Sequence, residues 1–167
     1  MDTGHNSSGP LRGKKTDTRE GHRVPFVIRW PEVTTPGSVS DALISQIDLM
    51  ATFAAAFDYQ LPTGQAEDSL NMMPVLRDQA ESPRDTLVYN NKLWGIRKGD
   101  WILLENPKVS KRADYLKANR FPKIQEGSDV LYNLSEDLGQ RVDLLKKYPE
   151  KTEQLREMLR QARSERN

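Results

Sequence analysis

Three short β-rich runs follow one another closely in the second half of the chain. They are residues 86–89 (TLVY), residues 93–97 (LWGIR) and residues 101–104 (WILL). Aromatic and branched side chains favour strands, and the residues between the runs, Asn90-Asn91 and residues 98–100 (KGD), are turn formers. Connections this short join antiparallel neighbours. The sequence therefore predicts an antiparallel meander, to which residues 130–134 (VLYNL) can add a fourth strand.

A helix is predicted on each side of the meander. Before it, apolar residues recur at three- and four-residue spacing, which predicts one amphipathic helix from about Ser40 to Phe57, capped by Ser40 or Asp41. After it, Pro149 stands where a helix can begin. The side of this second helix that we expect to be buried carries Leu155, Met158, Leu159 and Ala162.

An isolated apolar run, residues 26–30 (FVIRW), lies between Pro25 and Pro31. It predicts a buried strand with a stop at each end, and because no second strand pattern lies near it, its partners are expected outside the chain. A further apolar patch, residues 70–76, is interrupted by Pro74 and is expected to hold one or two helical turns. Residues 1–80 by themselves would therefore expose the edges of an unfinished sheet.

Composition limits the possible functions. A chain of 167 residues suits one domain, but 36% hydrophobic against 29% charged residues is poor in apolar side chains and fits part of a larger unit. The net charge of +1 provides no overall field towards nucleic acid or a membrane, so neither is an expected partner. The absence of cysteine excludes disulfides and thiolate chemistry. The polar start of the chain is not a signal peptide or a membrane span.

The first twenty-five residues hold an ordered set of motifs that resembles a sulfatase signature. The matching pieces are Asp2-Thr3-Gly4 (the family has Asp-Asn-Gly), residues 11–15 (LRGKK), residues 20–21 (EG) and residues 23–25 (RVP). Downstream, residues 40–52 resemble the family's helix after a Trp-Pro strand, and residues 131–139 resemble its Tyr-Asp-Leu segment. The chain is therefore similar to the C-terminal portion of a sulfatase of the arylsulfatase type.

This resemblance implies an α/β fold. Residues 1–84 would be the end of an alkaline-phosphatase-like catalytic domain, and residues 85–167 a small C-terminal subdomain with an antiparallel sheet and a C-terminal helix. The change of pattern near residue 85, from loop, strand and helix to meander and helix, agrees with this boundary.

The implied reaction is hydrolysis of sulfate esters, which makes the family sulfuric ester hydrolases. Their nucleophile is a formylglycine made from Cys or Ser in a Cys/Ser-x-Pro-Ser-Arg motif, and it acts by covalent catalysis. The sequence has no such motif, and residues 81–84 (ESPR) resemble it only in part because position 81 is Glu and the order differs. We therefore expect the formylglycine upstream, and the isolated chain to be catalytically incomplete.

The resemblance also implies a site in the N-terminal loop. Asp2 matches a ligand of the family's Ca2+, a cation that prefers oxygen ligands, and Thr3 occupies the position where the second ligand is usually Asn. Lys15 matches the sulfate-binding lysine, with Lys14 as the fallback if the loop register differs. His5 is a further candidate for lining the active site. Considered one by one, these residues also fit a turn aspartate, a solvated basic loop and a surface histidine.

Two alternative functions stay open. The chain can be a non-enzymatic module that holds an anionic polymer through the basic N-terminal loop or through residues 105–128, or a sister hydrolase of phosphoric esters. The expected partners of the sulfatase are a sulfated small molecule or glycan and the N-terminal part of the catalytic domain. An intact family member would be exported or periplasmic, although this chain carries no signal for export.

Overall fold

The computed structural model describes Leu11 and residues 23–78, 80–90, 93–107, 120–125 and 127–165. The described residues divide into two compact units, one spanning Pro25–Asp85 and the other, which we call the C-terminal unit, containing the described residues from Thr86 onwards. The assignment of residues 1–84 to the end of a catalytic domain and of residues 85–167 to a small C-terminal subdomain stays a prediction. None of the helices within the described residues is both long enough and apolar enough to span a membrane.

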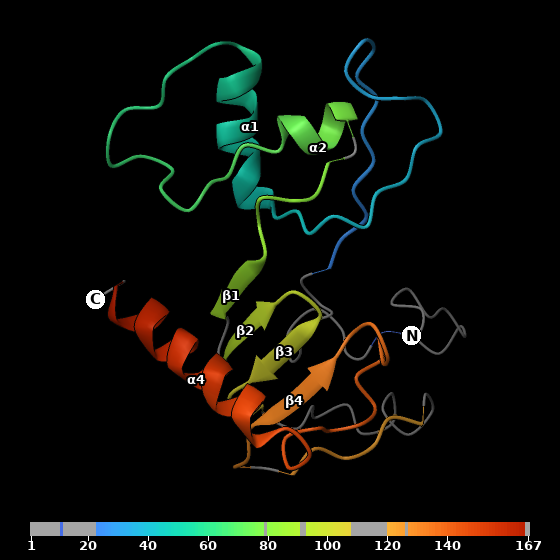
Figure 1. Ribbon diagram of the computed structural model, residues 1–167, viewed down its shortest axis with the longest axis vertical. Coiled ribbons are helices and arrows are strands. Elements are labelled where there is room, and N and C mark those ends of the chain that lie inside the picture. The colour runs from blue at the N-terminus through green and yellow to red at the C-terminus, as the bar shows by residue number, and fades with distance from the viewer. Residues whose placement is uncertain are drawn as a thin grey trace, which may run out of the picture. The chain divides into compact units, whose positions relative to one another are not determined.

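A four-stranded antiparallel sheet organises the C-terminal unit (Figure 1). Its strands are β1 (Thr86–Asn90), β2 (Trp94–Lys98), β3 (Trp101–Leu104) and β4 (Val130–Asn133). They pair in chain order, with Ile96 opposite Leu103 and Leu103 opposite Leu131. The predicted meander and its fourth strand are therefore confirmed.

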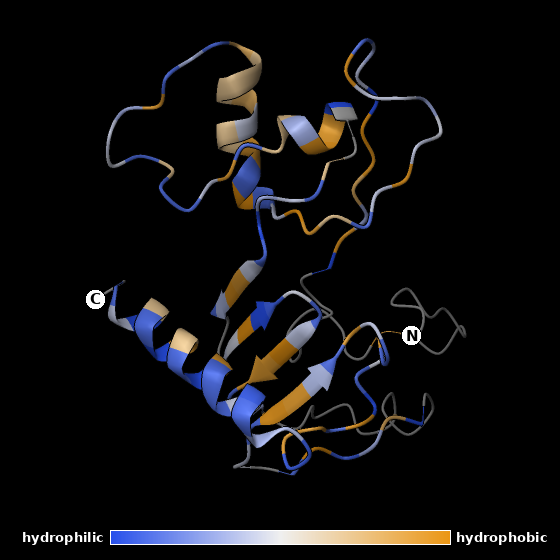
Figure 2. Ribbon diagram, viewed as in Figure 1, coloured by the Kyte–Doolittle hydropathy of each residue, from blue (hydrophilic) through white to orange (hydrophobic). Residues whose placement is uncertain are grey.

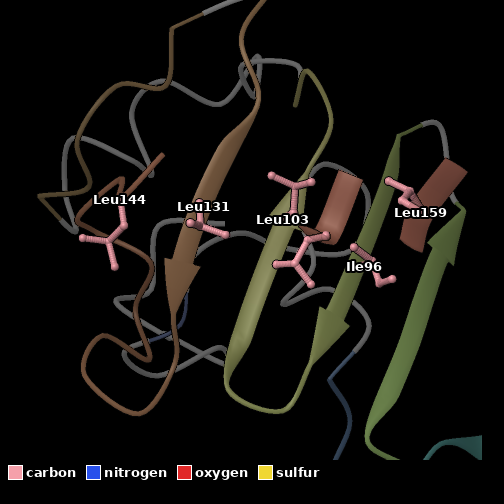
Figure 3. Packing of buried hydrophobic residues seen from close by; sticks show 6 residues of the cluster. Ile96, Leu103, Leu131, Leu144 and Leu159 are labelled. Carbon is pink, nitrogen blue, oxygen red and sulfur yellow. The ribbon is translucent and has the colours of Figure 1, made fainter. Parts of the chain in front are cut away.

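The helix α4 (Pro149–Ser164) packs on one face of this sheet. Leu155 and Leu159 of α4 are fully buried against Ile96, Leu103 and Leu131, as Figure 3 shows for the labelled side chains. Pro149 is the first helical residue, as the sequence predicts, because its missing N–H is one that the first turn does not use. Of the four residues expected on the buried side, Leu155 and Leu159 are fully buried, whereas Met158 and Ala162 are half-buried.

The opposite face of the sheet is also apolar and buried. Side chains alternate between the two faces along a strand, so the neighbours of Leu103 in β3 point away from α4. The buried cluster on this side consists of Ile102, Leu104, Val130, Tyr132 and Leu134. The sheet is thus the centre of a layered core rather than a surface layer.

Two glycines, one in a strand of the sheet and one in a turn, are needed at their positions for different structural reasons. Gly99 lies in the turn between β2 and β3 with φ +55°, a conformation that glycine adopts without strain. Gly95 lies inside β2, where an added Cβ would come within 2.7 Å of Leu104 Cδ2 and 3.1 Å of the Leu103 carbonyl oxygen. Gly95 is therefore required by the close approach of β3.

The Pro25–Asp85 unit contains a 3-10 turn, η2 (Gln46–Asp48), and two short helices, α1 (Leu49–Ala56) and α2 (Met73–Asp78). The predicted helix from Ser40 to Phe57 begins too early, because residues 40–45 are not helical. The Ser45 N–H donates to Asp48 Oδ2 (2.8 Å), so this pair starts the helical segment in place of Ser40 or Asp41. The short helix expected around Pro74 is confirmed as α2.

The prediction of a buried strand at residues 26–30 is wrong for this chain. The segment has no regular secondary structure among the described residues, Val27 is 93% exposed and Phe26 is half exposed. A strand needs a neighbour that accepts and donates its backbone hydrogen bonds, and the described residues provide none here. The apolar pattern alone therefore does not make a strand.

Candidate functional site

The residues of the predicted site lie outside the described part of the chain. These are Asp2, Thr3, His5, Lys14 and Lys15. Within the described ranges, no group of three or more His, Cys, Asp or Glu side chains is arranged to hold a metal ion. Within the Pro25–Asp85 unit, the main hydrogen-bond network is instead organised around one buried carboxylate, Asp48.

Asp48 lies at the junction of η2 and α1 and is completely buried. Its Oδ1 accepts a hydrogen bond from the Leu70 N–H (3.0 Å), and its Oδ2 accepts from the Ser45 N–H (2.8 Å). The Arg84 guanidinium binds the same carboxylate with two nitrogens, Nε to Oδ2 at 2.8 Å and Nη2 to Oδ1 at 2.5 Å. A buried charge is stable only when it is paired and hydrogen-bonded in this way.

Arg84 extends the network to the segments that flank it. Its Nη2 also donates to the Asp68 carbonyl oxygen, and its backbone N–H donates to Ser82 Oγ (3.0 Å). Ser82 Oγ in turn donates to the Leu43 carbonyl oxygen (2.6 Å). Ser82 and Arg84 belong to the 81–84 run that partly resembles the nucleophile motif, and their contacts give them a structural role.

A second row of hydrogen bonds runs along the same side of α1. Thr52 Oγ1 accepts from the Met72 N–H (3.0 Å) and donates to the Asp48 carbonyl oxygen (2.6 Å). The Ala51 N–H donates to Ser69 Oγ (2.9 Å). The inner side of α1 is thus polar and holds residues 69–72 by their backbone and side-chain groups.

The electrostatics of Asp48 indicate a structural group rather than a general acid or base. Burial alone would raise the pKa of Asp48, but the hydrogen bonds from Arg84, Leu70 and Ser45 and the charge of Arg84 outweigh it and hold the pKa below its usual value. A carboxylate with every oxygen bonded and a low pKa is a poor proton carrier. Its function is to tie three segments of the unit together.

Sequence reasoning did not single out Asp48 or Arg84 as a pair. The available signal was one acidic residue within an otherwise apolar helical pattern, Ile47-Asp48-Leu49, which predicts a buried and paired carboxylate. The identity of its partner is not readable because Arg84 lies 36 residues away.

The C-terminal motif is also structural where it is described. Asn133 is buried and its Oδ1 accepts from the Ser135 N–H (3.1 Å). Asp143 Oδ1 accepts from the Leu131 N–H (3.1 Å), which ties the segment after the turn to β4. Gln140 is fully buried. Gln140 and Asp143, which follow the 131–139 segment, therefore have roles in local packing and hydrogen bonding.

The fold is that of an alkaline-phosphatase-like α/β protein, with a small antiparallel sheet and a C-terminal helix after it. A family model described as Sulfatase matches residues 2–59. An N-acetylgalactosamine-6-O-sulfatase of Bacteroides thetaiotaomicron is 33% identical over 162 residues, and arylsulfatase A of Bos taurus is 31% identical over 150 residues. These alignments cover 93% and 83% of this chain. The chain belongs to the sulfatase family and corresponds to its C-terminal portion.

A solved structure from work on the metabolism of multiple glycosaminoglycans by Bacteroides thetaiotaomicron has the same fold. It matches with a TM-score of 0.79 and 30% identity, over 96% of this chain and 33% of that one. The chain spans 30% of the length of the N-acetylgalactosamine-6-O-sulfatase and 29% of that of arylsulfatase A. The resemblance inferred from the motifs is thus confirmed at the level of the family.

Proposed function

We propose that this chain contributes the C-terminal portion of an enzyme that hydrolyses sulfate esters. The observation that supports this most directly is the similarity to an N-acetylgalactosamine-6-O-sulfatase along 93% of the chain. Members of the family are sulfatases, and the chain carries the family's ordered motifs from Asp2 to Pro25. Because the chain spans 30% of that relative, activity is expected only from a complete catalytic domain.

In the complete enzyme, the N-terminal loop would bind the sulfate group. Lys15 is the proposed sulfate ligand, since its ammonium group would neutralise the charge that develops on a sulfate oxygen. Lys14, its neighbour, is the fallback. His5 would line the same site.

A Ca2+ ion fits the chemistry of the first residues of this loop. The carboxylate of Asp2 and the hydroxyl of Thr3 are oxygen donors, which Ca2+ prefers, and the cation when bound would polarise the sulfate. Ca2+ takes about six to eight oxygen ligands, so further ligands would come from sequence beyond this pair. The hydroxyl of Thr3 is neutral, so Asp2 would contribute the charge.

The nucleophile would also come from outside these residues. The 167-residue sequence has no cysteine and no Cys/Ser-x-Pro-Ser-Arg run, and Ser82 is held by Leu43 and Arg84. A formylglycine supplied by the preceding part of a sulfatase domain would complete the covalent chemistry. We therefore expect no turnover from the isolated chain.

The decisive experiment starts with the DNA upstream of the first codon. Translation in all three frames should reveal the Cys/Ser-x-Pro-Ser-Arg motif, and the rejoined gene should then hydrolyse 4-nitrophenyl sulfate in preference to 4-nitrophenyl phosphate. Preference for the phosphate would favour the sister phosphoric ester hydrolase. Salt-sensitive binding of a polyanion without turnover would favour the binding module.

The proposed substrate is a sulfated glycan. The relative from Bacteroides thetaiotaomicron is named for a 6-O-sulfated N-acetylgalactosamine. N-acetylgalactosamine 6-sulfate should therefore be assayed beside the aryl sulfate. Hydrolysis of the aryl sulfate alone would contradict the glycan assignment but not the reaction class.

A further inference from the structure

The η2–α1 segment of the Pro25–Asp85 unit is amphipathic, but its polar side is buried and its apolar side is exposed. Its buried residues are polar: Asp48 and Thr52 are four positions apart and bind the backbone N–H groups of Leu70 and Met72. Residues three or four positions apart share one side of a helix. The inner side of α1 therefore satisfies backbone hydrogen bonds, whereas most helices of this kind bury apolar side chains there.

The outer side of the same segment is apolar and uncovered. Ile47, Met50, Phe53 and Phe57 follow one another at three- and four-residue spacing, and together they form what we call the outer stripe. Met50 is 59% exposed and Phe57 is 77% exposed. Figure 2 shows most of α1 in hydrophobic colours. No residue of α1 is charged, which is typical of helices that are buried on all sides.

An aromatic ring from another segment of the same unit lies beside the stripe. The ring of Phe53 lies 6.5 Å from that of Trp30, which ends the apolar run of residues 26–30. Phe26 and Val27 in that run are also exposed. Large apolar side chains gathered in this way are typical of interaction sites, because their contact with water is unfavourable.

We propose that the outer stripe is the docking surface for the remaining part of a sulfatase catalytic domain. The stripe lies within residues 2–59, which match the sulfatase family model, and the chain spans only 30% of its N-acetylgalactosamine-6-O-sulfatase relative. The polypeptide that would cover the stripe is therefore the part of such an enzyme that precedes the matched region, whether linked to this chain or separate. This inference rests on the proposed function and names the partner surface.

The test uses the full 167-residue chain and one defined probe. The probe is the part of the Bacteroides thetaiotaomicron N-acetylgalactosamine-6-O-sulfatase that precedes its matched region, co-expressed with an affinity tag. We expect the tagged probe to capture the chain. The double variant Met50→Gln, Phe57→Gln should reduce capture at least about tenfold, since each substitution places an amide against an apolar partner.

A matched control separates docking from folding. Val39 is 85% exposed in the same unit but outside the stripe, so Val39→Gln should be captured like the wild type. Hydrogen exchange at the Met72 amide reports the inner side of α1, and the double variant should retain its protection. If that protection is lost, the single variant Met50→Gln provides the test instead.

Three outcomes would overturn the inference. They are absence of capture of the wild-type chain, equal capture of the double variant, and a concentration-dependent dimer of the chain alone that the double variant abolishes. The last outcome would identify a second copy as the occupant. Capture without sulfate release would support the docking surface and contradict only the proposed function, because docking requires no turnover.

Discussion

The buried carboxylate of Asp48 accepts hydrogen bonds from two nitrogens of Arg84, a residue that lies 36 positions later in the chain. The pair joins the start of α1 to the last residues of the Pro25–Asp85 unit. Both side chains are removed from water, Asp48 completely and Arg84 to 9% exposure. The stability of this unit therefore depends on keeping both partners.

Replacing Arg84 with Ala should destabilise the Pro25–Asp85 unit by about 3–5 kcal/mol, because it leaves the Asp48 charge buried without its partner. The measurement is hydrogen exchange at the Leu70 amide, which donates to Asp48. Arg84→Lys should not restore protection, since one ammonium cannot replace the two-pronged guanidinium contact. Arg77→Ala, at an exposed position of α2, is the matched control and should leave the Leu70 amide protected.

Acid should weaken the same unit. The pKa of Asp48 is lowered in the folded chain, so the ionised carboxylate stabilises the fold above its unfolded pKa of about 3.9. This stabilisation should be lost as the pH falls below about 4 and through the lower folded pKa. Measured by urea unfolding between neutral and acid pH, Asp48→Asn should remove this part of the pH dependence. If the variant and the wild type lose stability identically in acid, the pH dependence comes from other carboxylates.

Gly95→Ala should destabilise the C-terminal sheet by about 1–3 kcal/mol, since the added methyl group would overlap Leu104 Cδ2 and crowd the Leu103 carbonyl oxygen. Gly99→Asn is the comparison, because position 99 is open and asparagine tolerates its positive φ. Urea unfolding followed by circular dichroism should show a clear loss for the first variant and little for the second. Equal stability of the two variants would contradict the close approach of β2 and β3.

Leu159→Ala should cost about 2–5 kcal/mol, because Leu159 is fully buried between α4 and the sheet. Gln161→Ala on the exposed side of α4 should change the free energy of unfolding by less than about 0.5 kcal/mol. Urea midpoints of the two variants give the comparison. A small effect at position 159 would mean that the packing of α4 on the sheet contributes little to the free energy of unfolding.

In the rejoined enzyme, Lys15→Ala should lower kcat/KM for 4-nitrophenyl sulfate by about 10²–10³-fold, as expected when one group that stabilises transition-state charge is removed. Lys14→Ala should stay near the wild-type value. The reverse result would identify Lys14, and not Lys15, as the sulfate-binding lysine. Melting temperatures of both variants, measured without substrate, control for loss of folding.

Local patterns predicted the C-terminal unit well. The meander, the fourth strand and the start of α4 at Pro149 all depend on turn residues and on periodicities within a few positions. The motifs of the N-terminal loop also indicated the sulfatase family, which the comparisons confirmed. The candidate residues Asp2 and Lys15 stay predictions because they lie outside the described residues.

The sequence by itself determined the antiparallel meander of β1 to β3, the start of α4 and the family, since each is encoded in short runs of residues. The pairing of β4 with β3 was decided by the tertiary structure. Only the tertiary structure decided that residues 26–30 form no strand and that the helical segment begins at η2 rather than at Ser40. The physical reason is that both outcomes depend on distant partners. A strand requires another backbone to pair with, and the start of α1 is held by Leu70 and Arg84, which bind Asp48 from positions far along the chain.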